Sequence, residues 1–356
     1  MKILSIVGAR PQFVKAAAIS RAIRCVPGLE EVLVHTGQHL DANMSQVFFE
    51  ELEIPEPHHN LAISGGGHGE MTGRMLEALE RTALLEKPDY VLVFGDTNST
   101  LAGALAAAKL HIPVAHVEAG LRSHNRRMPE EVNRILTDHV GTVLLCPTLR
   151  AVENLAAEGI THGVHHVGDV MYDVMLHAIK GLQAKHNSDV LERLSVNENG
   201  YFVATVHRAE NTDDPAQLAK ILTYLKSRAA EHPVVFPIHP RTRDAVTRSR
   251  LDLNGLTVCE PVSYLDMTLL LAGAVGVLTD SGGLQKEAYF HRTPCVTLRD
   301  ETEWVETIEC GWNRLWSQPN FAEPRCDIPE YGDGKTADRI VSIIVDRFGK
   351  SSRPTT

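Results

Sequence analysis

The sequence feature that most constrains the fold is an alternation of short apolar segments with longer amphipathic segments, which runs along the chain twice. Short apolar runs predict buried strands, and segments with apolar residues three and four positions apart predict helices. Strands and helices that alternate in this way form parallel sheets covered by helices on both faces. We therefore expect an α/β fold.

The expected elements divide into two series. In the first half, strands are expected at residues 3–7, 31–35, 90–94, 113–117 and 143–146, and helices at 13–23, 70–84, 100–110 and 130–140. In the second half, strands are expected at residues 202–205, 234–238, 256–259, 275–278 and 295–298, and helices at 216–230, 264–271 and 284–290.

The chain of 356 residues is long enough for two domains that each bury a core. We expect two Rossmann-like, doubly wound domains at residues 1–180 and 181–334, with the ligand in the cleft between them. A last helical segment, residues 335–348, has no strand after it. We expect this segment, within 335–356, to pack back across the hinge and to be followed by a disordered tail from residue 349.

Composition excludes several classes of protein. The net charge of −10 disfavours a nucleic-acid binder, which usually has a basic face. The chain has no run of about 18 apolar residues for a membrane span and no secretory leader at its N-terminus, so we expect a cytoplasmic protein that does not bind membranes. The cysteines and histidines lack metal-ligand spacing, so no metal site is predicted.

The first loop with chemical potential is Gly8-Ala9-Arg10-Pro11-Gln12, with Lys15 one turn later. Arg10 would project toward a cleft where the N-terminus of a helix favours anions. A capped turn between a strand and a helix explains the same residues equally well. The chain has neither a G-x-G-x-x-G fingerprint nor a P-loop.

Three carboxylates lie at neighbouring strand ends or helix starts of the first half. Asp96 follows the expected strand 90–94, Glu118 ends the strand 113–117, and Glu130 opens a helix. Asp96 could simply cap a helix, and Glu130 could complement a helix dipole. Together they predict a site for general acid–base chemistry, which needs carboxylates that converge.

The second half supplies groups that suit a nucleotide diphosphate. His207 and His239 each follow a strand, and His207 is a candidate proton carrier or phosphate donor. Ser281-Gly282-Gly283 opens a helix, where backbone N–H groups and small side chains admit a phosphate. Glu287 lies one turn further, where its carboxylate can accept both hydroxyls of a ribose. This combination predicts a site for a nucleotide diphosphate.

These loops, in this order, resemble those of the non-hydrolysing UDP-N-acetylglucosamine 2-epimerases, which have the GT-B fold. The resemblance covers nearly the whole chain, and its specificity comes from several motifs together. The motifs are Gly8-Ala9-Arg10-Pro11, Gly95-Asp96-Thr97, His116-Val117-Glu118-Ala119-Gly120, Pro129-Glu130-Glu131, Asp280-Ser281-Gly282-Gly283 and Tyr331-Gly332-Asp333-Gly334.

The resemblance implies an isomerase that inverts C2 of a UDP-2-acetamido sugar. UDP leaves C1 as the C2 proton is removed, which gives a 2-acetamidoglucal, and UDP then re-adds with protonation on the opposite face. The family uses no NAD or metal, so no cofactor is expected, and its members usually form homodimers. The expected partners are thus the UDP-sugar and UDP.

Carried over position by position, the resemblance implies a role for each candidate residue. Asp96, Glu118 and Glu130 are acid–base carboxylates, and the sequence leaves open which one is the base. His207 assists departure of the diphosphate. The substrate-binding residues implied are Arg10 and Lys15 in the first domain, and Ser281, Gly283 and Glu287 in the second.

Departures from the usual family pattern bear on the sugar. Gly-Ala-Arg-Pro-Gln stands where Gly-Thr-Arg-Pro-Glu is usual, and Thr302-Glu303-Trp304-Val305-Glu306 replaces Thr-Glu-Arg-Pro-Glu. With His207-Arg208-Ala209-Glu210-Asn211, these changes resemble the subgroup that acts on UDP-2,3-diacetamido-2,3-dideoxy-glucuronate. The C6 carboxylate of that sugar would favour another cation, for which Arg126 and Arg127 are candidates. A solvated basic pair is the alternative interpretation. We favour the uronate over UDP-N-acetylglucosamine.

Some family members are activated by a second substrate molecule. The segment Gln38-His39-Leu40-Asp41 lacks the Arg and the Gln or Glu that commonly follow Gln-His there, which disfavours such activation. Gln38 and Arg74 are the residues that could still line a second site.

Three alternative functions remain at the level of sequence. A hydrolysing 2-epimerase would release the free sugar and UDP. A GT-B glycosyltransferase could use the same fold and the same diphosphate loop. A catalytically silent nucleotide-sugar-binding protein is a third possibility, which the carboxylates and His207 disfavour.

Overall fold

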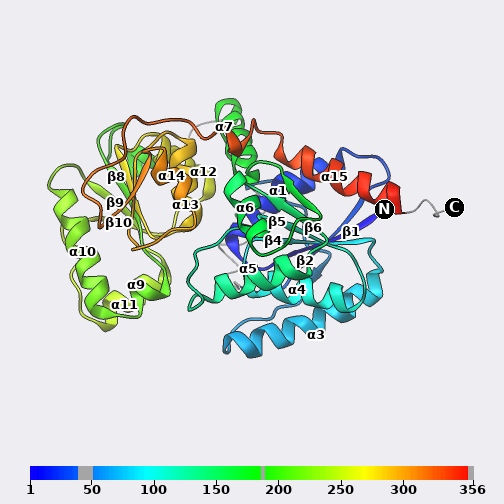
Figure 1. Cartoon of the computed structure of the whole chain (residues 1–356). Coiled ribbons are helices and arrows are strands. Elements are labelled where there is room, and N and C mark those ends of the chain that lie inside the picture. Colours follow the sequence, from blue (N-terminus) through cyan, green and yellow to red (C-terminus); the bar gives the residue numbers. More distant parts are fainter. Residues whose placement is uncertain (39–50, 186–188, 352–356) are drawn as a thin grey trace. The chain divides into compact units, whose positions relative to one another are not determined.

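The computed structural model describes residues 1–38, 51–185 and 189–351, and apart from the side chains of residues 10, 182–185 and 348–351 it places their side chains. The chain forms two compact units (Figure 1). The first contains Met1–Leu176 and the C-terminal segment from Pro329, and the second contains His177–Ile328. Each unit is built on its own parallel sheet.

In the described part of the first unit, seven parallel strands form a sheet in the order β3-β2-β1-β4-β5-β6-β7. The chain therefore reverses direction across the sheet between β1 and β4, which is the switch point at which ligands bind in such folds. The strands are β1 (Lys2–Val7), β2 (Glu30–His35), β3 (His59–Asn60), β4 (Tyr90–Phe94), β5 (Val114–Val117), β6 (Val143–Cys146) and β7 (Val164–His166).

Helices cover both faces of this sheet. In Figure 1, α3, α4 and α5 lie along one face, while α1 and α15 pack together on the other. The helices of the unit are α1 (Arg10–Arg24), α3 (His68–Glu86), α4 (Asn98–Lys109), α5 (Pro129–Val140), α6 (Leu149–Ala157), α7 (Val170–Lys185), which runs on into the second unit, and α15 (Thr336–Ser351), with a 3-10 turn at Pro329–Tyr331.

The second unit repeats this plan. Its strands, all parallel, lie in the order β10-β9-β8-β11-β12-β13, with the switch point between β8 and β11. The strands are β8 (Phe202–Thr205), β9 (Val234–Pro237), β10 (Thr257–Cys259), β11 (Gly276–Thr279), β12 (Cys295–Thr297) and β13 (Asn313–Leu315). The helices are α8 (Val190–Arg193), α9 (Ala209–Thr212), α10 (Pro215–Ala229), α11 (Pro240–Arg248), α12 (Tyr264–Ala272), α13 (Gly282–Phe290) and α14 (Val305–Glu309).

Successive strand residues serve the two faces of the second sheet. Phe202 and Ala204 of β8 belong to the core under α10 and α11, whereas Val203 belongs to the core under α12 and α13. This alternation with a period of two residues is what the pleat of a strand imposes. Because both faces are covered, the strands are apolar throughout, as expected for parallel sheets.

The expected fold class is confirmed, and every expected strand is present with shifts of a residue or so at its ends. Sequence reasoning missed the edge strands β3, β7 and β13, which are short and partly polar, and the short helices α6, α8, α9, α11 and α14. The expectation that regular structure ends before residue 349 was wrong, because α15 continues to Ser351. The rest of the expected tail lies outside the described residues. In the part of the chain that the structure describes, no helix has the length and apolarity needed to cross a membrane.

Two helical glycines are expected to respond to substitution in opposite directions. Gly73 is exposed within α3, and an added Cβ would meet nothing within 4 Å among the described residues. A Cβ at Gly103 of α4 would lie 2.6 Å from Cδ1 of Ile6 in the core. Gly73→Ala should therefore raise the free energy of unfolding by about 0.5–1 kcal/mol, and Gly103→Val should lower it by about 1–3 kcal/mol. Urea denaturation measures both, and equal midpoints for the two variants would contradict the packing of α4 on β1.

Candidate active site

Three loops of the first unit meet around a buried ion pair. Lys15 of α1 contacts the carboxylate of Glu118, which follows β5, and the two side chains are only 8% and 10% exposed. Gly95, which follows β4, lies beside both, since an added Cβ would be 3.3 Å from Glu118 Oε2 and 3.3 Å from Lys15 Nζ. Lys15 and Glu118, both of which the sequence predicts as site residues, are therefore in contact.

The backbone of Glu118 adopts an unusual conformation. Its φ is +72°, in the left-handed region that residues with a side chain rarely occupy. The N–H groups of Glu118 and Ala119 both donate to the carbonyl oxygen of Leu145, at 3.1 and 3.2 Å, and so hold this turn in place. Backbone strain that is fixed by surrounding contacts is concentrated at functional sites.

Asp96 does not cap the helix that follows it. The N-cap of α4 is Thr97, whose side chain accepts a hydrogen bond from the N–H of Thr100. The Asp96 carboxylate instead contacts the guanidinium of Arg134 from α5. Arg134 is only 3% exposed, but Asp96 is 31% exposed, so the aspartate is held firmly and still accessible. Asp96 is therefore not the N-cap of α4, and capping does not explain its presence.

Glu131, next to the predicted Glu130, anchors the loop before α5. It accepts hydrogen bonds from the N–H of Ser123 at 2.9 Å and of His124 at 2.9 Å, and it pairs with Arg134 at 2.7 Å. Burial alone would raise the pKa of Glu131, but the hydrogen bonds from Ser123 and the charge of Arg134 outweigh it, and the pKa is lowered. Glu131 is therefore a structural carboxylate, and Arg134 links it to Asp96.

Glu130 and Arg127 lie at the same end of α5. Glu130 is half-buried in the first turn of the helix, and Arg127 is exposed just before it. The backbone N–H of Arg127 donates to Oδ1 of Asn125 at 3.1 Å, which fixes the turn but leaves the guanidinium at the surface. Arg126 is exposed as well.

A fully buried charge cluster connects these loops. Nδ1 of His116 lies 2.7 Å from Oδ1 of Asp138, and Nε2 lies 2.7 Å from the carbonyl oxygen of Gly95. Asp138 also accepts from Arg122 at 2.7 Å and from the N–H of Gly120 at 3.1 Å. Burial would raise the pKa of Asp138, but His116 and Arg122 outweigh it, so the pKa is lowered. The cluster holds the ends of β4 and β5 on either side of Glu118.

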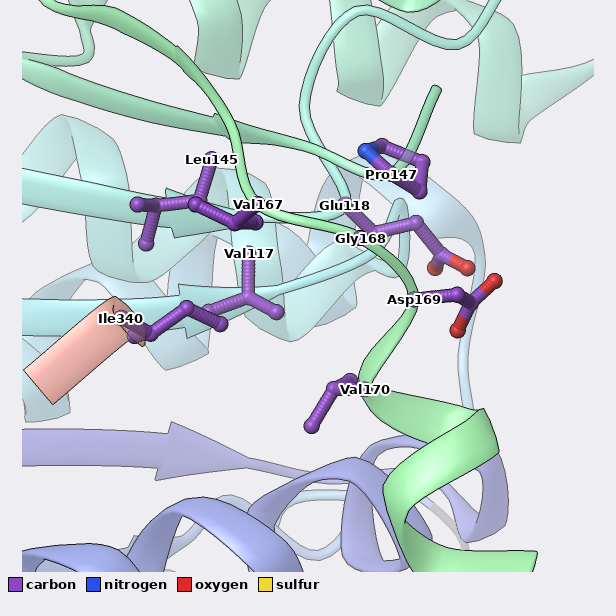
Figure 2. A pocket seen from close by; sticks show the side chains of 9 residues that line it. All are labelled: Val117, Glu118, Leu145, Pro147, Val167, Gly168, Asp169, Val170 and Ile340. Carbon is purple, nitrogen blue, oxygen red and sulfur yellow. The ribbon is translucent and has the colours of Figure 1, made fainter. Parts of the chain in front are cut away.

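A pocket in the first unit places a further carboxylate beside Glu118. It is lined by Val117, Glu118, Leu145, Pro147, Val167, Gly168, Asp169, Val170 and Ile340. Figure 2 shows the side chains of Glu118 and Asp169 extending to the same side, with the apolar side chains of Val117 and Leu145 behind them. Asp169 is 2% exposed, and its Oδ1 accepts from the N–H of Met171 at 2.8 Å. Sequence reasoning missed Asp169, although it follows a strand and precedes a helix as Asp96 does.

In the second unit, a buried aspartate joins the two loops at the switch point. Asp280, which follows β11, is fully buried and accepts from the N–H of His207 at 3.0 Å and of Arg208 at 2.9 Å. It also accepts from Nδ2 of Asn211 at 3.0 Å. His207 is thereby held beside Ser281, the residue after Asp280. Asp280 thus joins the loop of His207 to the loop that begins with Ser281.

Two histidines of the second unit lie together. The ring centroids of His207 and His239 are 5.5 Å apart, and the rings are tilted by 37°. His239 is the N-cap of α11, because its Nδ1 accepts from the N–H of Arg241 at 3.2 Å. The ring of His207 therefore lies next to the ring of His239, and His239 also caps α11.

The loop that opens α13 has small residues, Ser281, Gly282 and Gly283, at the start of the helix. Ser281 is the N-cap, and its hydroxyl accepts from the N–H of Leu284 at 3.4 Å. At Gly282 a Cβ would lie 2.4 Å from Oε1 of Glu303, so a side chain there would displace this carboxylate, whereas at Gly283 a Cβ would meet no described atom within 4 Å. Glu287 lies further along α13 and is half-buried. A helix N-terminus with an open face is a site for an anion.

The two candidates for a second site have separate partners. Oε1 of Gln38 accepts from the N–H of Ser99 at 3.1 Å and from its hydroxyl at 2.8 Å. Arg74 donates to the carbonyl oxygens of Ser64 at 3.0 Å and Gly65 at 2.5 Å. Residues 39–41 lie outside the described residues, as does the side chain of Arg10.

Comparison with known proteins identifies the family. The family model for UDP-N-acetylglucosamine 2-epimerase matches residues 21–345. A UDP-N-acetylglucosamine 2-epimerase homolog of Methanococcus maripaludis is 53% identical, with 97% of this chain and 99% of the relative covered. The UDP-2,3-diacetamido-2,3-dideoxy-D-glucuronate 2-epimerase of Pseudomonas aeruginosa is 54% identical, with 88% of each chain covered.

Solved structures agree. The UDP-GlcNAc 2-epimerase of Methanocaldococcus jannaschii in complex with UDP-GlcNAc and UDP superimposes with a TM-score of 0.90 at 40% identity, covering 97% of this chain and 100% of that chain. The two parallel-sheet α/β units are therefore those of a GT-B epimerase. This chain belongs to the UDP-N-acetylglucosamine 2-epimerase family, and it is a UDP-sugar 2-epimerase, an isomerase, as its sequence predicted.

Removal of the buried charge of Asp138 is expected to destabilise the protein. Asp138→Asn removes the buried carboxylate that accepts from His116, Arg122 and Gly120, and Arg122 keeps only its pair with the partly exposed Glu158, so the free energy of unfolding should fall by about 3 kcal/mol. Since the pKa of Asp138 is lowered by folding, its contribution is complete above the pKa of the unfolded chain and is lost as the pH falls through the folded pKa. Urea unfolding should show the full difference from wild type at pH 5 and a smaller difference below about pH 4.

The control for this experiment is Asp252→Asn. Asp252 pairs with Lys226 at 2.8 Å on the surface and is 58% exposed, so its substitution should leave the urea midpoint nearly unchanged. Equal effects of the two substitutions would show that the cluster around Asp138 does not stabilise the fold.

Proposed function

We propose that this enzyme inverts C2 of UDP-2,3-diacetamido-2,3-dideoxy-glucuronate, and of UDP-N-acetylglucosamine less efficiently, by eliminating UDP and adding it back. Support for the uronate comes from the P. aeruginosa relative that is named for this sugar and is 54% identical. Relatives named for UDP-N-acetylglucosamine are 53% and 43% identical in M. maripaludis and 40% identical in M. jannaschii. The sequence departures at Gln12 and Trp304 point the same way.

The observation that carries the proposal is the buried pair of Lys15 and Glu118 beside the accessible Asp96. The ammonium of Lys15 holds the Glu118 carboxylate in place, and a general base must be positioned before it takes a proton. Asp96 is held by Arg134 and is 31% exposed, so a substrate can reach it. We assign proton removal and return at C2 to Asp96, Glu118 and Glu130, which lie at the ends of neighbouring strands or at a helix start.

Departure of UDP requires groups that accept its developing charge. We assign this role to His207 and to the loop Ser281-Gly282-Gly283, where the N-terminal end of α13 and its backbone N–H groups favour a diphosphate. Glu287 would bind the ribose, and His239 would support the ring of His207. Arg10 and Lys15 would contact the same substrate from the first unit, and the working enzyme would be a homodimer.

Proton exchange at C2 tests the reaction. In D2O the enzyme should epimerise the UDP-sugar and place deuterium at C2, as NMR would show, without accumulation of free UDP. Glu118→Gln and Asp96→Asn should each slow exchange by about 100-fold or more, because each removes a carboxylate without changing its size. The matched control is Glu153→Gln, since Glu153 is exposed on α6 and its change should leave the rate unaltered.

Other outcomes of this experiment distinguish the competing functions. Free sugar with an equal amount of UDP would identify a hydrolysing epimerase. Absence of C2 exchange with every UDP-2-acetamido sugar would contradict the proposal and favour a glycosyltransferase. Wild-type rates in Asp96→Asn or Glu118→Gln would remove that residue from the proton transfer.

Choice of the uronate is expected to depend on Arg127. Its guanidinium lies at the surface just before α5, where it can reach an anionic sugar. Arg127→Ala should lower kcat/KM about tenfold for the uronate, an effect in the range of one charge-assisted hydrogen bond, and should leave UDP-N-acetylglucosamine unaffected. Arg150, exposed on α6, supplies the control variant Arg150→Ala. Equal losses on both sugars would contradict the role in specificity.

A further inference from the structure

One buried hydrogen-bond donor beside the anion loop of the second unit is unsatisfied. Trp304, in the segment after β12, is 2% exposed, and its indole Nε1 has no hydrogen-bond partner among the described residues. A buried tryptophan N–H usually finds a partner, because an unpaired buried donor costs about 1–3 kcal/mol. The other two indoles follow that rule, since Trp312 donates to the carbonyl oxygen of Cys326 at 3.1 Å and Trp316 to Asp300 at 3.0 Å.

The unsatisfied N–H lies at the start of α13. A Cβ built on Gly282 would be 2.4 Å from Oε1 of Glu303, 3.5 Å from Nε1 of Trp304 and 3.6 Å from Nη2 of Arg208. The Glu303 carboxylate therefore lies against Gly282, and the indole N–H and the guanidinium border the same space. Both groups are donors, and they stand beside the helix N-terminus, whose own N–H groups favour an anion.

A buried lysine strengthens this donor. Nζ of Lys286 lies 3.9 Å from the centroid of the Trp304 ring, and Lys286 is 1% exposed. A cation over the face of an indole is attracted by its π electrons, and it draws electron density from the ring. The N–H at the ring edge then becomes more positive and a better donor to an anion. Lys286 thus affects the anion loop indirectly, by polarising the ring of Trp304.

The neighbouring carboxylates do not take this donor. Glu303 is bound by Arg299 at 2.9 Å and lies 3.8 Å from Arg208. Asp280 receives the backbone N–H groups of the His207 loop. Among the described residues, the buried Nε1 of Trp304 therefore has no hydrogen-bond acceptor.

We propose that Nε1 of Trp304 donates a hydrogen bond to the diphosphate of UDP at the Ser281-Gly282-Gly283 loop, and that Lys286 strengthens this bond through the ring. The inference rests on the proposed function, because it takes the ligand of the loop to be UDP. It adds Trp304 as a binding residue and gives the buried Lys286 a positioning role.

Calorimetric titration of the full chain with UDP and with uridine tests the proposal. Trp304→Phe keeps an aromatic ring over Lys286 and removes only the N–H, so the Kd for UDP should rise about 10-fold or more, while the Kd for uridine should not change. Lys286→Met should weaken UDP binding less than Trp304→Phe does. The control is Trp316→Phe, which removes an indole N–H bonded to Asp300 and should bind UDP as wild type does.

Failure of the proposed function and failure of the proposed role of Trp304 give different results. A wild-type enzyme that does not bind UDP contradicts the proposed function itself. Unchanged UDP binding by Trp304→Phe overturns the role of the indole. If this variant binds UDP normally but has a higher KM for the uronate alone, the N–H belongs to the sugar carboxylate, and the proposal is again overturned.

A second measurement uses the wild-type chain and does not depend on the stability of any variant. With 15N-labelled tryptophan, the indole N–H signal of Trp304 should move downfield when UDP is added and should not move with uridine. The signals of Trp312 and Trp316, whose N–H groups are already bonded, serve as internal references. A Trp304 signal that does not respond to UDP would overturn the proposal.

Discussion

In each unit, a fully buried aspartate carboxylate holds the loops at the carboxyl ends of the strands. Asp138 accepts hydrogen bonds from His116, Arg122 and the backbone of Gly120. Asp280 accepts from the backbone of His207 and Arg208 and from Asn211. A buried charge is stable only when its lone pairs are satisfied, so each aspartate fixes the loops that supply its donors. The candidate catalytic residues lie on these same loops.

This arrangement separates structural carboxylates from chemical ones. The structural carboxylates are buried, and their oxygens accept hydrogen bonds from loop backbones or from cations. They belong to Asp138, Glu131 and Asp280. Asp96 and Glu118 are each held by a cation, Arg134 and Lys15, and Asp96 is 31% exposed. An enzyme that must remove a weakly acidic proton needs carboxylates of this second kind, which are held in place and do not anchor the loops.

Much of this could be predicted from the sequence, because the signals are local. Apolar runs located the strands, and polar residues after each run located Asp96, Glu118, His207 and Ser281 at the ends of parallel strands. Edge strands such as β3 and β13 were missed, since a short strand with one neighbour has little apolar signal.

The partners of these residues could not be predicted. Arg134 lies on a different element from Asp96, and Lys15 is separated from Glu118 by most of the first unit. Pairings over such distances depend on how the loops meet in space. The same holds for Asp169, which enters the pocket beside Glu118, and for Trp304, whose unsatisfied N–H is evident only once Gly282 is placed beside it.

In the proposed reaction, the bond between C1 and the diphosphate oxygen breaks and re-forms in every productive encounter. Positional isotope exchange measures this directly. A UDP-sugar with 18O in the bridge between C1 and the β-phosphorus is incubated with the enzyme, and 31P NMR follows the label. Elimination frees the β-phosphate to rotate, so 18O should move into the non-bridging positions as epimerisation proceeds. Epimerisation with all of the 18O still in the bridge would contradict elimination and re-addition of UDP.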